Sequence, residues 1–112
     1  MKTRTGFVSN SSSTSFIITN TSNKPLTLVD FVVENREVLN NFNFIYGYDY
    51  KLSDLIKDAE NLNITFEPNS SRECVFGDED GNTIGHVYDY GLRDNSPYPD
   101  RKFTWQFKEH LR

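Results

Sequence analysis

Several residue types and patterns that usually guide interpretation are scarce in this chain. Cysteine occurs once in 112 residues, at Cys74, which excludes an intramolecular disulfide and fits a reducing compartment. The longest apolar runs are triplets, so the sequence contains no candidate membrane-spanning helix. No apolar stretch of signal-peptide length follows the basic start. We therefore expect the protein to stay in the cytoplasm of the cell that produces it and to have no membrane partner.

Positive charge is also limited. Twelve Lys and Arg residues face sixteen Asp and Glu residues, which gives a formal net charge of -4, and neither sign forms a long run. A protein that binds nucleic acid by neutralising phosphates needs a basic patch or stripe. This charge balance predicts that nucleic acid is not a partner.

Aliphatic residues are few, and aromatic residues take their place. Hydrophobic residues make up only 36% of the chain, whereas nine Phe, six Tyr and one Trp bring the aromatic content to 14%. Large aromatic side chains supply the buried area that one modest core requires. We predict a single domain over 1–112, with an N-terminal arm and Ser-rich loop at 1–14 and a folded body at 15–112.

Periodicity and turn residues predict an α+β fold. Helical spacing of apolar residues predicts two helices, at 28–41 behind an N-cap at Thr27 and at 54–61 behind an N-cap at Ser53. Alternation predicts strands at 15–20, 63–67, 73–77, 83–90 and 102–108. The Asp-Gly-Asn turn at 80–82 predicts a hairpin between 73–77 and 83–90, and 43–50 is either a short strand or an aromatic-rich turn. The expected fold is a mainly antiparallel sheet with both helices on one face.

The last predicted strand carries three aromatic residues on one face, Phe103, Trp105 and Phe107. Such a row can stack on bases in proteins that bind single strands. We interpret the row as part of the core because the chain has few other large residues.

The N-terminal segment is the most distinctive part of the sequence. Six small polar residues, Asn10 to Ser15, separate Phe7-Val8 from Phe16-Ile17-Ile18. Burying a hydroxyl without a partner costs about 1–3 kcal/mol, so this many hydroxyls predict a solvated loop. We expect Phe7 and Phe16 to be anchored in the body on either side of that loop.

The same segment carries a resemblance. Lys2, Arg4, Gly6 to Ser13, Ser15 and Phe16 match the opening of small, mostly uncharacterised proteins of large-genome bacteriophages and some bacteria, with Thr14 in place of a usual serine. The chain resembles these proteins over its first seventh. The resemblance implies a phage origin and carries no assigned activity or functional residues.

A short pattern, Tyr-Asp-Tyr-x-Leu-x-Asp, occurs twice, from Tyr48 and from Tyr88. Tyrosine is favoured at protein interfaces. The repeat does not extend outward from these residues, which is typical of chance in a chain rich in Tyr and Asp. If it is functional, the two copies are exposed edges that form a contact rim, and the Ser-rich loop is a further contact surface. The predicted contact residues are Ser11, Ser12, Ser13, Thr14, Tyr48, Asp49, Tyr50, Tyr88, Asp89 and Tyr90.

Candidate chemistry is incomplete elsewhere in the chain. Asp78 to Ile84 resembles half of a calcium loop, but Thr83 stands where an EF-hand needs glycine. Cys74, His86 and Asp89 suggest a nucleophile, a base and an orienting acid, yet the acidic surroundings disfavour a reactive thiolate. We therefore interpret Cys74 as structural and expect no metal, no cofactor and no catalytic residue.

The leading hypothesis is a small non-catalytic, phage-encoded module that acts by protein–protein contact. It would be either a minor virion component or a host-directed effector. The alternative is a phosphate- or nucleotide-binding protein or enzyme. Its anion pocket would be formed by Arg4, Asn10, Ser11, Ser12 and Ser13.

Overall fold

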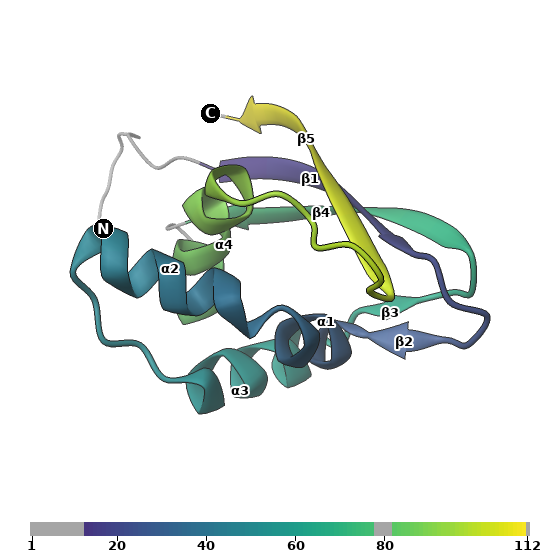
Figure 1. Ribbon diagram of the computed structural model, residues 1–112, viewed down its shortest axis with the longest axis horizontal. Helices are drawn as coiled ribbons and strands as arrows, with labels where there is room; N and C mark the ends of the chain where they lie inside the picture. The colour runs from purple at the N-terminus through teal and green to yellow at the C-terminus, as the bar shows by residue number, and fades with distance from the viewer. Residues whose placement is uncertain (1–12, 78–81, 112) are drawn as a thin grey trace.

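A computed structural model describes residues 13–77 and 82–111, and the fold is α+β as predicted (Figure 1). A three-stranded antiparallel sheet has the order β4-β1-β5, formed by β1 (Ser13–Asn20), β4 (Ser70–Gly77) and β5 (Phe103–Leu111). A second, two-stranded sheet pairs β2 (Leu26–Thr27) with β3 (Thr65–Phe66). The helices are α1 (Leu28–Glu34), α2 (Arg36–Tyr46), α3 (Leu52–Leu62) and α4 (Thr83–Asp94).

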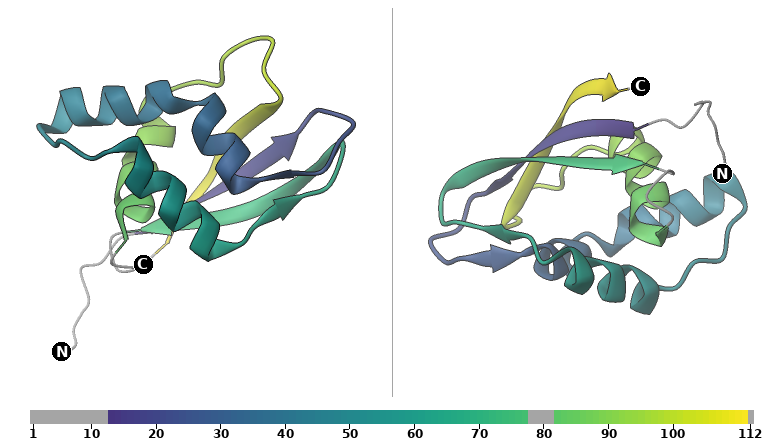
Figure 2. Two further views of the ribbon diagram at one scale, coloured as in Figure 1. Left: turned by 90° about the horizontal axis from the view of Figure 1, so that it is seen from below. Right: turned by 180° about the vertical axis from the view of Figure 1, so that it is seen from behind.

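The central strand β1 determines which face of the sheet is covered. Phe16 and Ile18 point to the helical side and are fully buried, whereas Ile17, between them, is only partly buried. On the neighbouring strand β4, Glu73 and Val75 are exposed. The β1–β4 part of the sheet therefore has one face open to solvent, and the helices lie on its other face (Figure 2). The strand predicted at 15–20 is confirmed and begins two residues earlier.

The predicted helix at 28–41 is two helices. Thr27 is the N-cap, as expected, and it forms a capping box with Asp30. Asn35 interrupts it, with φ -113° and ψ 42°, and its side-chain amide donates to the carbonyl of Phe31. The second helix, α2, continues to Tyr46 and ends at Gly47, whose φ of 74° suits glycine. The strand or turn predicted at 43–50 is therefore wrong over its first half.

Helix α3 and the strands next to it follow the sequence pattern more loosely. The structure confirms a helix around 54–61, with Asp54 in its first turn, but the N-cap is Lys51 and not Ser53. The strand predicted at 63–67 is reduced to β3. Strand β4 begins at Ser70, three residues before the strand predicted at 73–77.

The predicted hairpin between 73–77 and 83–90 is wrong, because residues from Thr83 form helix α4. Asn82 caps this helix by accepting from the backbone N–H of Gly85 at 2.7 Å. Asp58 of α3 accepts from the N–H groups of Thr83 and Ile84 at 2.8 and 3.1 Å. These contacts satisfy N–H groups that have no partner within the helix.

A glycine allows this helix to start close to the sheet. A Cβ on Gly85 would lie 2.5 Å from the carbonyl oxygen of Gly77, at the end of β4. Only a residue without a side chain fits there unless the backbone moves.

The calcium-like segment includes Asp78 to Gly81, which lie outside the described residues.

Aromatic residues make a large contribution to the core, as the composition predicts, since eight of the 19 buried hydrophobic residues described are Phe, Tyr or Trp. The ring of Phe31 on α1 meets those of Tyr88, Phe103 and Trp105 edge-on, at centroid distances of 5.6, 5.2 and 5.6 Å. Phe103 and Trp105 are buried as expected, whereas Phe107 is 50% exposed. The prediction that all three aromatic residues of β5 are core is therefore wrong for Phe107.

An ion pair ties the start of β5 to the helices. Arg101 donates two parallel hydrogen bonds to the carboxylate of Glu37, at 2.9 and 2.8 Å, and a further one to the carbonyl of Glu34. The hydrogen bond from Arg101 lowers the pKa of Glu37 to about 2. The Glu34 carboxylate accepts from the N–H groups of Lys102 and Phe103.

We expect the Glu37→Gln variant to lose a pH-dependent part of the stability. Because the folded-state pKa of Glu37 is depressed, its contribution is complete above about pH 4.5 and is lost as the pH falls towards 2. Solvent screens this partly exposed pair, so the difference at pH 7 should stay below about 1 kcal/mol. Urea unfolding at pH 7 and pH 3 measures it, and a wild-type advantage that is larger at pH 3 would contradict the assignment.

Candidate functional site

Of the residues predicted for the Ser-rich loop, the structure describes only the last few. Arg4, Asn10, Ser11 and Ser12, and Phe7 with them, lie outside the described residues. Ser13 and Thr14 are not loop residues. They begin β1, are buried, and pair with β4 on one side and β5 on the other. The prediction that both lie on an exposed contact surface is therefore wrong, whereas the anion pocket predicted from Ser13 together with Arg4 and 10–12 falls mainly outside the described residues.

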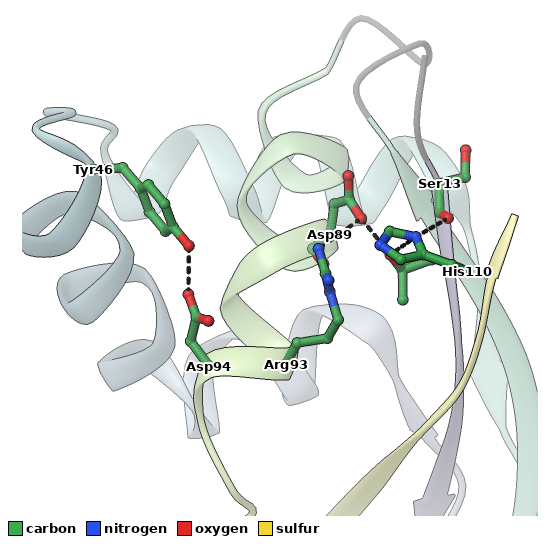
Figure 3. A network of polar contacts seen from close by, with 7 residues as sticks. Ser13, Tyr46, Asp89, Arg93, Asp94 and His110 are labelled. Atoms are coloured by element: carbon green, nitrogen blue, oxygen red, sulfur yellow. Dashed lines mark hydrogen bonds and ion pairs between the residues drawn. The ribbon is translucent and has the colours of Figure 1, made fainter. Parts of the chain in front are cut away.

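Thr14 belongs to a polar network between β1, α4 and β5 (Figure 3). Its hydroxyl donates to the carboxylate of Asp89, which is fully buried on α4. Arg93, one helical turn later, places a guanidinium nitrogen 3.8 Å from the same carboxylate. His110 of β5 lies 3.4 Å from the Thr14 hydroxyl and 3.2 Å from the Ser13 carbonyl, measured from its Nδ1.

This network has the character of a structural cross-link. A buried carboxylate is costly unless hydrogen-bond donors and a counter-charge surround it. Thr14 supplies a donor and Arg93 the opposite charge. Since Thr14 is fully buried and its hydroxyl faces a carboxylate, a substrate cannot reach it. The network fixes α4 against the sheet.

The second Tyr-Asp-Tyr copy is not an exposed edge, and the prediction of a contact surface is wrong for Tyr88 and Asp89. Buried residues of α4 recur at helical spacing, so Tyr88 points into the core against Phe31 and Phe76. The Tyr88 hydroxyl has no hydrogen-bond partner among the described residues, and burial raises its pKa far above the usual range. Tyr90 is the half-buried member of the three.

Removing the unpaired hydroxyl with Tyr88→Phe should raise the free energy of unfolding by about 1 kcal/mol, because a buried polar group without a partner is destabilising. The matched control is Tyr46→Phe. The Tyr46 hydroxyl donates to Asp94 at 2.8 Å near the surface, so its loss should lower stability slightly. Urea unfolding of both variants gives the comparison, and a destabilised Tyr88→Phe would show that the hydroxyl has a partner.

Cys74, His86 and Asp89 do not form a nucleophilic site. Cys74 lies in the core on β4, and desolvation raises the pKa of its thiol to about 11. His86 contacts Tyr50, whose hydroxyl oxygen is 2.9 Å from the ring Nδ1. A thiol with this pKa stays protonated and unreactive at neutral pH. Within residues 13–77 and 82–111, no cluster of three or more His, Cys, Asp or Glu residues could hold a metal ion.

The first Tyr-Asp-Tyr copy is at the surface, as predicted, in the connection between α2 and α3. Tyr48 is exposed and its ring stacks on that of Tyr50, with centroids 5.0 Å apart and planes at 9°. Both rings also stack on the buried Phe42 of α2. The carboxylate side chain of Asp49 is 96% exposed. The Tyr-Asp-Tyr segment therefore rests on the core and presents its edge to solvent.

The end of α2, next to this segment, is the most exposed apolar surface described. Phe44 is 89% exposed and Ile45 56% exposed, with Tyr46 partly exposed beside them. Helix α2 reaches one end of the long axis of the molecule (Figure 1). We call Phe44, Ile45, Tyr46 and Tyr48 the aromatic ridge. Single exposed apolar side chains are ordinary, but four of them within five consecutive residues indicate a candidate interaction site.

One side chain holds the connection that follows α2. The amide nitrogen of Asn43 donates to the carbonyl of Tyr50 at 3.0 Å, and its oxygen accepts from the Tyr50 N–H at 3.2 Å. The Asn43 carbonyl accepts from the N–H groups of Gly47 and Tyr48 at 2.9 and 3.2 Å. These bonds set the conformation of 47–50.

Sequence reasoning missed Phe44, Ile45 and Asn43 as site residues. The relevant signal was present, because Phe42 and Phe44 cannot both face the core from one helix. The missing information was that 43–46 is helical, since alternation in that segment also fits a strand.

Comparison with protein-family models, curated proteins and solved structures gives no match for this chain. None of the helices described in 13–77 and 82–111 has the length and apolar character needed to cross a bilayer.

Proposed function

We propose that this chain is a small, non-catalytic module that binds another protein through the aromatic ridge. The observation that carries the proposal is the exposure of Phe44 and Ile45 at the end of a well-packed helix. Burying one such side chain in a partner is worth about 1.5–3 kcal/mol. In the absence of a partner, that free energy is not gained.

The support beneath the ridge favours binding over simple surface exposure. Tyr48 stacks on Tyr50 and Phe42, and Tyr46 donates to Asp94. The Asn43 hydrogen bonds hold the connection in one conformation. A surface that is already ordered loses little conformational entropy on association. Rigid aromatic residues at the centre of a contact are typical of binding hot spots.

The charges beside the ridge indicate the chemistry of the partner. Asp94 accepts a hydrogen bond from Tyr46, and the exposed Asp49 lies 3.8 Å from the ammonium nitrogen of Lys51. The chain as a whole has a net charge of -4. Complementary charges steer association and select partners. The ridge therefore suits an apolar pocket on a protein whose rim carries Lys or Arg.

The N-terminal resemblance bears on where that partner is found. Small phage-encoded proteins with the Gly-Phe-Val-Ser-Asn signature suggest either a virion protein or a host protein as the partner. A minor component of the particle would be recovered in purified virions. A host-directed effector would be recovered from the cytoplasm of infected cells and be absent from particles.

Comparison of two variants with the wild-type chain tests the proposal. The double variant Phe44→Ser with Ile45→Ser removes the apolar tip of the ridge, and Val75→Ser is the control because Val75 is a similarly exposed apolar residue on the sheet. Tagged full-length chains are used to recover proteins from infected cells and from particles. The recovered partner is then purified and titrated against all three chains.

We expect the partner to bind wild type and Val75→Ser equally and the ridge variant at least tenfold more weakly. Circular dichroism should show the same fold for all three. A partner that binds the ridge variant as tightly as wild type would overturn the proposal, as would recovery of no partner from either source.

A further inference from the structure

A hollow of about 360 Å³ lies between the C-terminal end of α4 and β5. It is bounded on one side by the end of α4 and residues 95–97, and on the other by β5. Its volume is within the range of about 300–1,000 Å³ that is usual for small-ligand sites. Its described lining combines apolar side chains with one charged side chain, that of Arg93.

The walls are already formed. Trp105 donates its indole N–H to the carbonyl of Leu92 at 2.9 Å, which fixes the strand and the helix on the two sides of the hollow. Phe107 packs edge-on against Phe16, with centroids 6.3 Å apart, and its ring remains half exposed. Pro97 adds a rigid apolar surface. An apolar ring entering between these walls would displace water from a site that needs no rearrangement.

The half-exposed position of Phe107 has a local cause. The register between β1 and β5 shifts between Ser15 and Phe16, where the β5 partner changes from Glu109 to Phe107. Lys108 is the extra residue of a β-bulge. Bulges bend a strand and redirect its side chains. This one lies directly beside the aromatic wall of the hollow.

Among the described residues that line the hollow, Arg93 is the only charged one. Its Nε donates to the carbonyl of Asp89 at 2.8 Å, one terminal nitrogen lies 3.8 Å from the Asp89 carboxylate, and the guanidinium sits 5.0 Å from the ring centroid of Tyr90. The side chain is held in place and yet 27% exposed. The Nη1 atom of Arg93 makes no hydrogen bond within the described part of the chain. Its two N–H groups can therefore donate to a bound anion.

We propose that this hollow binds a small carboxylic acid that carries one aromatic ring. The ring lies against Phe107, Trp105 and Pro97, and the carboxylate accepts hydrogen bonds from the Arg93 guanidinium. A guanidinium matches the planar geometry of a carboxylate. Because Asp89 offsets part of the positive charge, the ring and the anion are both needed for binding.

The experiment uses the full-length, ¹⁵N-labelled chain and four probes. 3-Phenylpropionate has both features, 3-phenylpropan-1-ol keeps the ring without the charge, 3-phenylpropylamine reverses the charge, and propionate lacks the ring. We expect saturable shifts for 3-phenylpropionate at the Trp105 indole N–H and at the amides of Leu92 to Ser96. The alcohol should bind at least tenfold more weakly, and the amine and propionate should give no saturable shift.

Variants locate the site without disturbing Asp89. Ser96 lines the hollow and is exposed, so Ser96→Glu adds a repelling charge, whereas Ser96→Gln adds the same bulk without charge. We expect Ser96→Glu to bind 3-phenylpropionate at least tenfold more weakly than Ser96→Gln. Phe107→Ala should weaken binding of both the acid and the alcohol.

Equal binding of the acid and the alcohol would overturn the proposal. Equal affinities of the two Ser96 variants, or shifts that cluster outside the hollow, would do the same. The aromatic ridge variant should bind 3-phenylpropionate like wild type, so this test and the test of the protein contact succeed or fail separately.

Discussion

Replacing Phe31 by Ala is expected to lower the free energy of unfolding by about 3–5 kcal/mol, the usual cost of truncating a fully buried Phe. Phe31 is fully buried and its ring meets three other aromatic rings edge-on. Those rings belong to α4 and β5, so the cavity would lie where three elements meet. Alanine is the better helix former, but that offsets only about 0.5 kcal/mol.

The control for this prediction is the same substitution on the neighbouring helix. Phe44 is 89% exposed, so Phe44→Ala removes equal volume without opening a cavity. Its free energy of unfolding should stay within about 0.5 kcal/mol of wild type. Urea unfolding followed by tryptophan fluorescence measures both variants through Trp105. Equal losses for the two variants would mean that Phe31 is not in the core.

The second large effect is expected at Asp89. Replacing it by Ala leaves the buried Thr14 hydroxyl without its acceptor and the Arg93 guanidinium without its counter-charge. Breaking one side of a buried, charged hydrogen-bonded pair costs about 3–5 kcal/mol, and the partial exposure of Arg93 places the expected loss near the lower limit. Thermal and urea unfolding measure it.

Two threonine variants distinguish the contribution of the Thr14–Asp89 hydrogen bond to stability from the general effect of a substitution in β1. Thr14→Val keeps the shape of the side chain but removes the donor to Asp89, which should cost about 1–3 kcal/mol. Thr19→Val, on the same strand, loses only a surface hydrogen bond to Ser71 and should change stability by less than about 0.5 kcal/mol. Equal effects would contradict a special role for the Thr14–Asp89 bond.

The elements that were predicted correctly are those with a clear local pattern. The helix around 54–61 has an apolar stripe and an acidic first turn, and β5 has strict alternation at its start. The N-cap predicted at Thr27 directly precedes the helix that it begins. Such signals depend only on neighbours along the chain.

Helix α4 shows why local patterns can fail. Ile84, His86, Tyr88 and Tyr90 alternate as in a strand, and two glycines disfavour a helix. The same segment also has apolar residues at helical spacing, with Ile84, Val87, Tyr88 and Leu92 all buried. Contacts far along the chain favour the helix. Asp58 binds its first N–H groups, and Gly85 fits against Gly77.

The amino-acid sequence by itself determined the fold class, the large aromatic share of the core and the helix around 54–61. Each of these follows from composition, short-range periodicity or a turn. Only the tertiary structure decided that Thr14 and Asp89 are buried together and that Phe44 and Ile45 remain outside. Segments distant along the chain compete for the same buried space, and whether a side chain is covered depends on which of them pack against it.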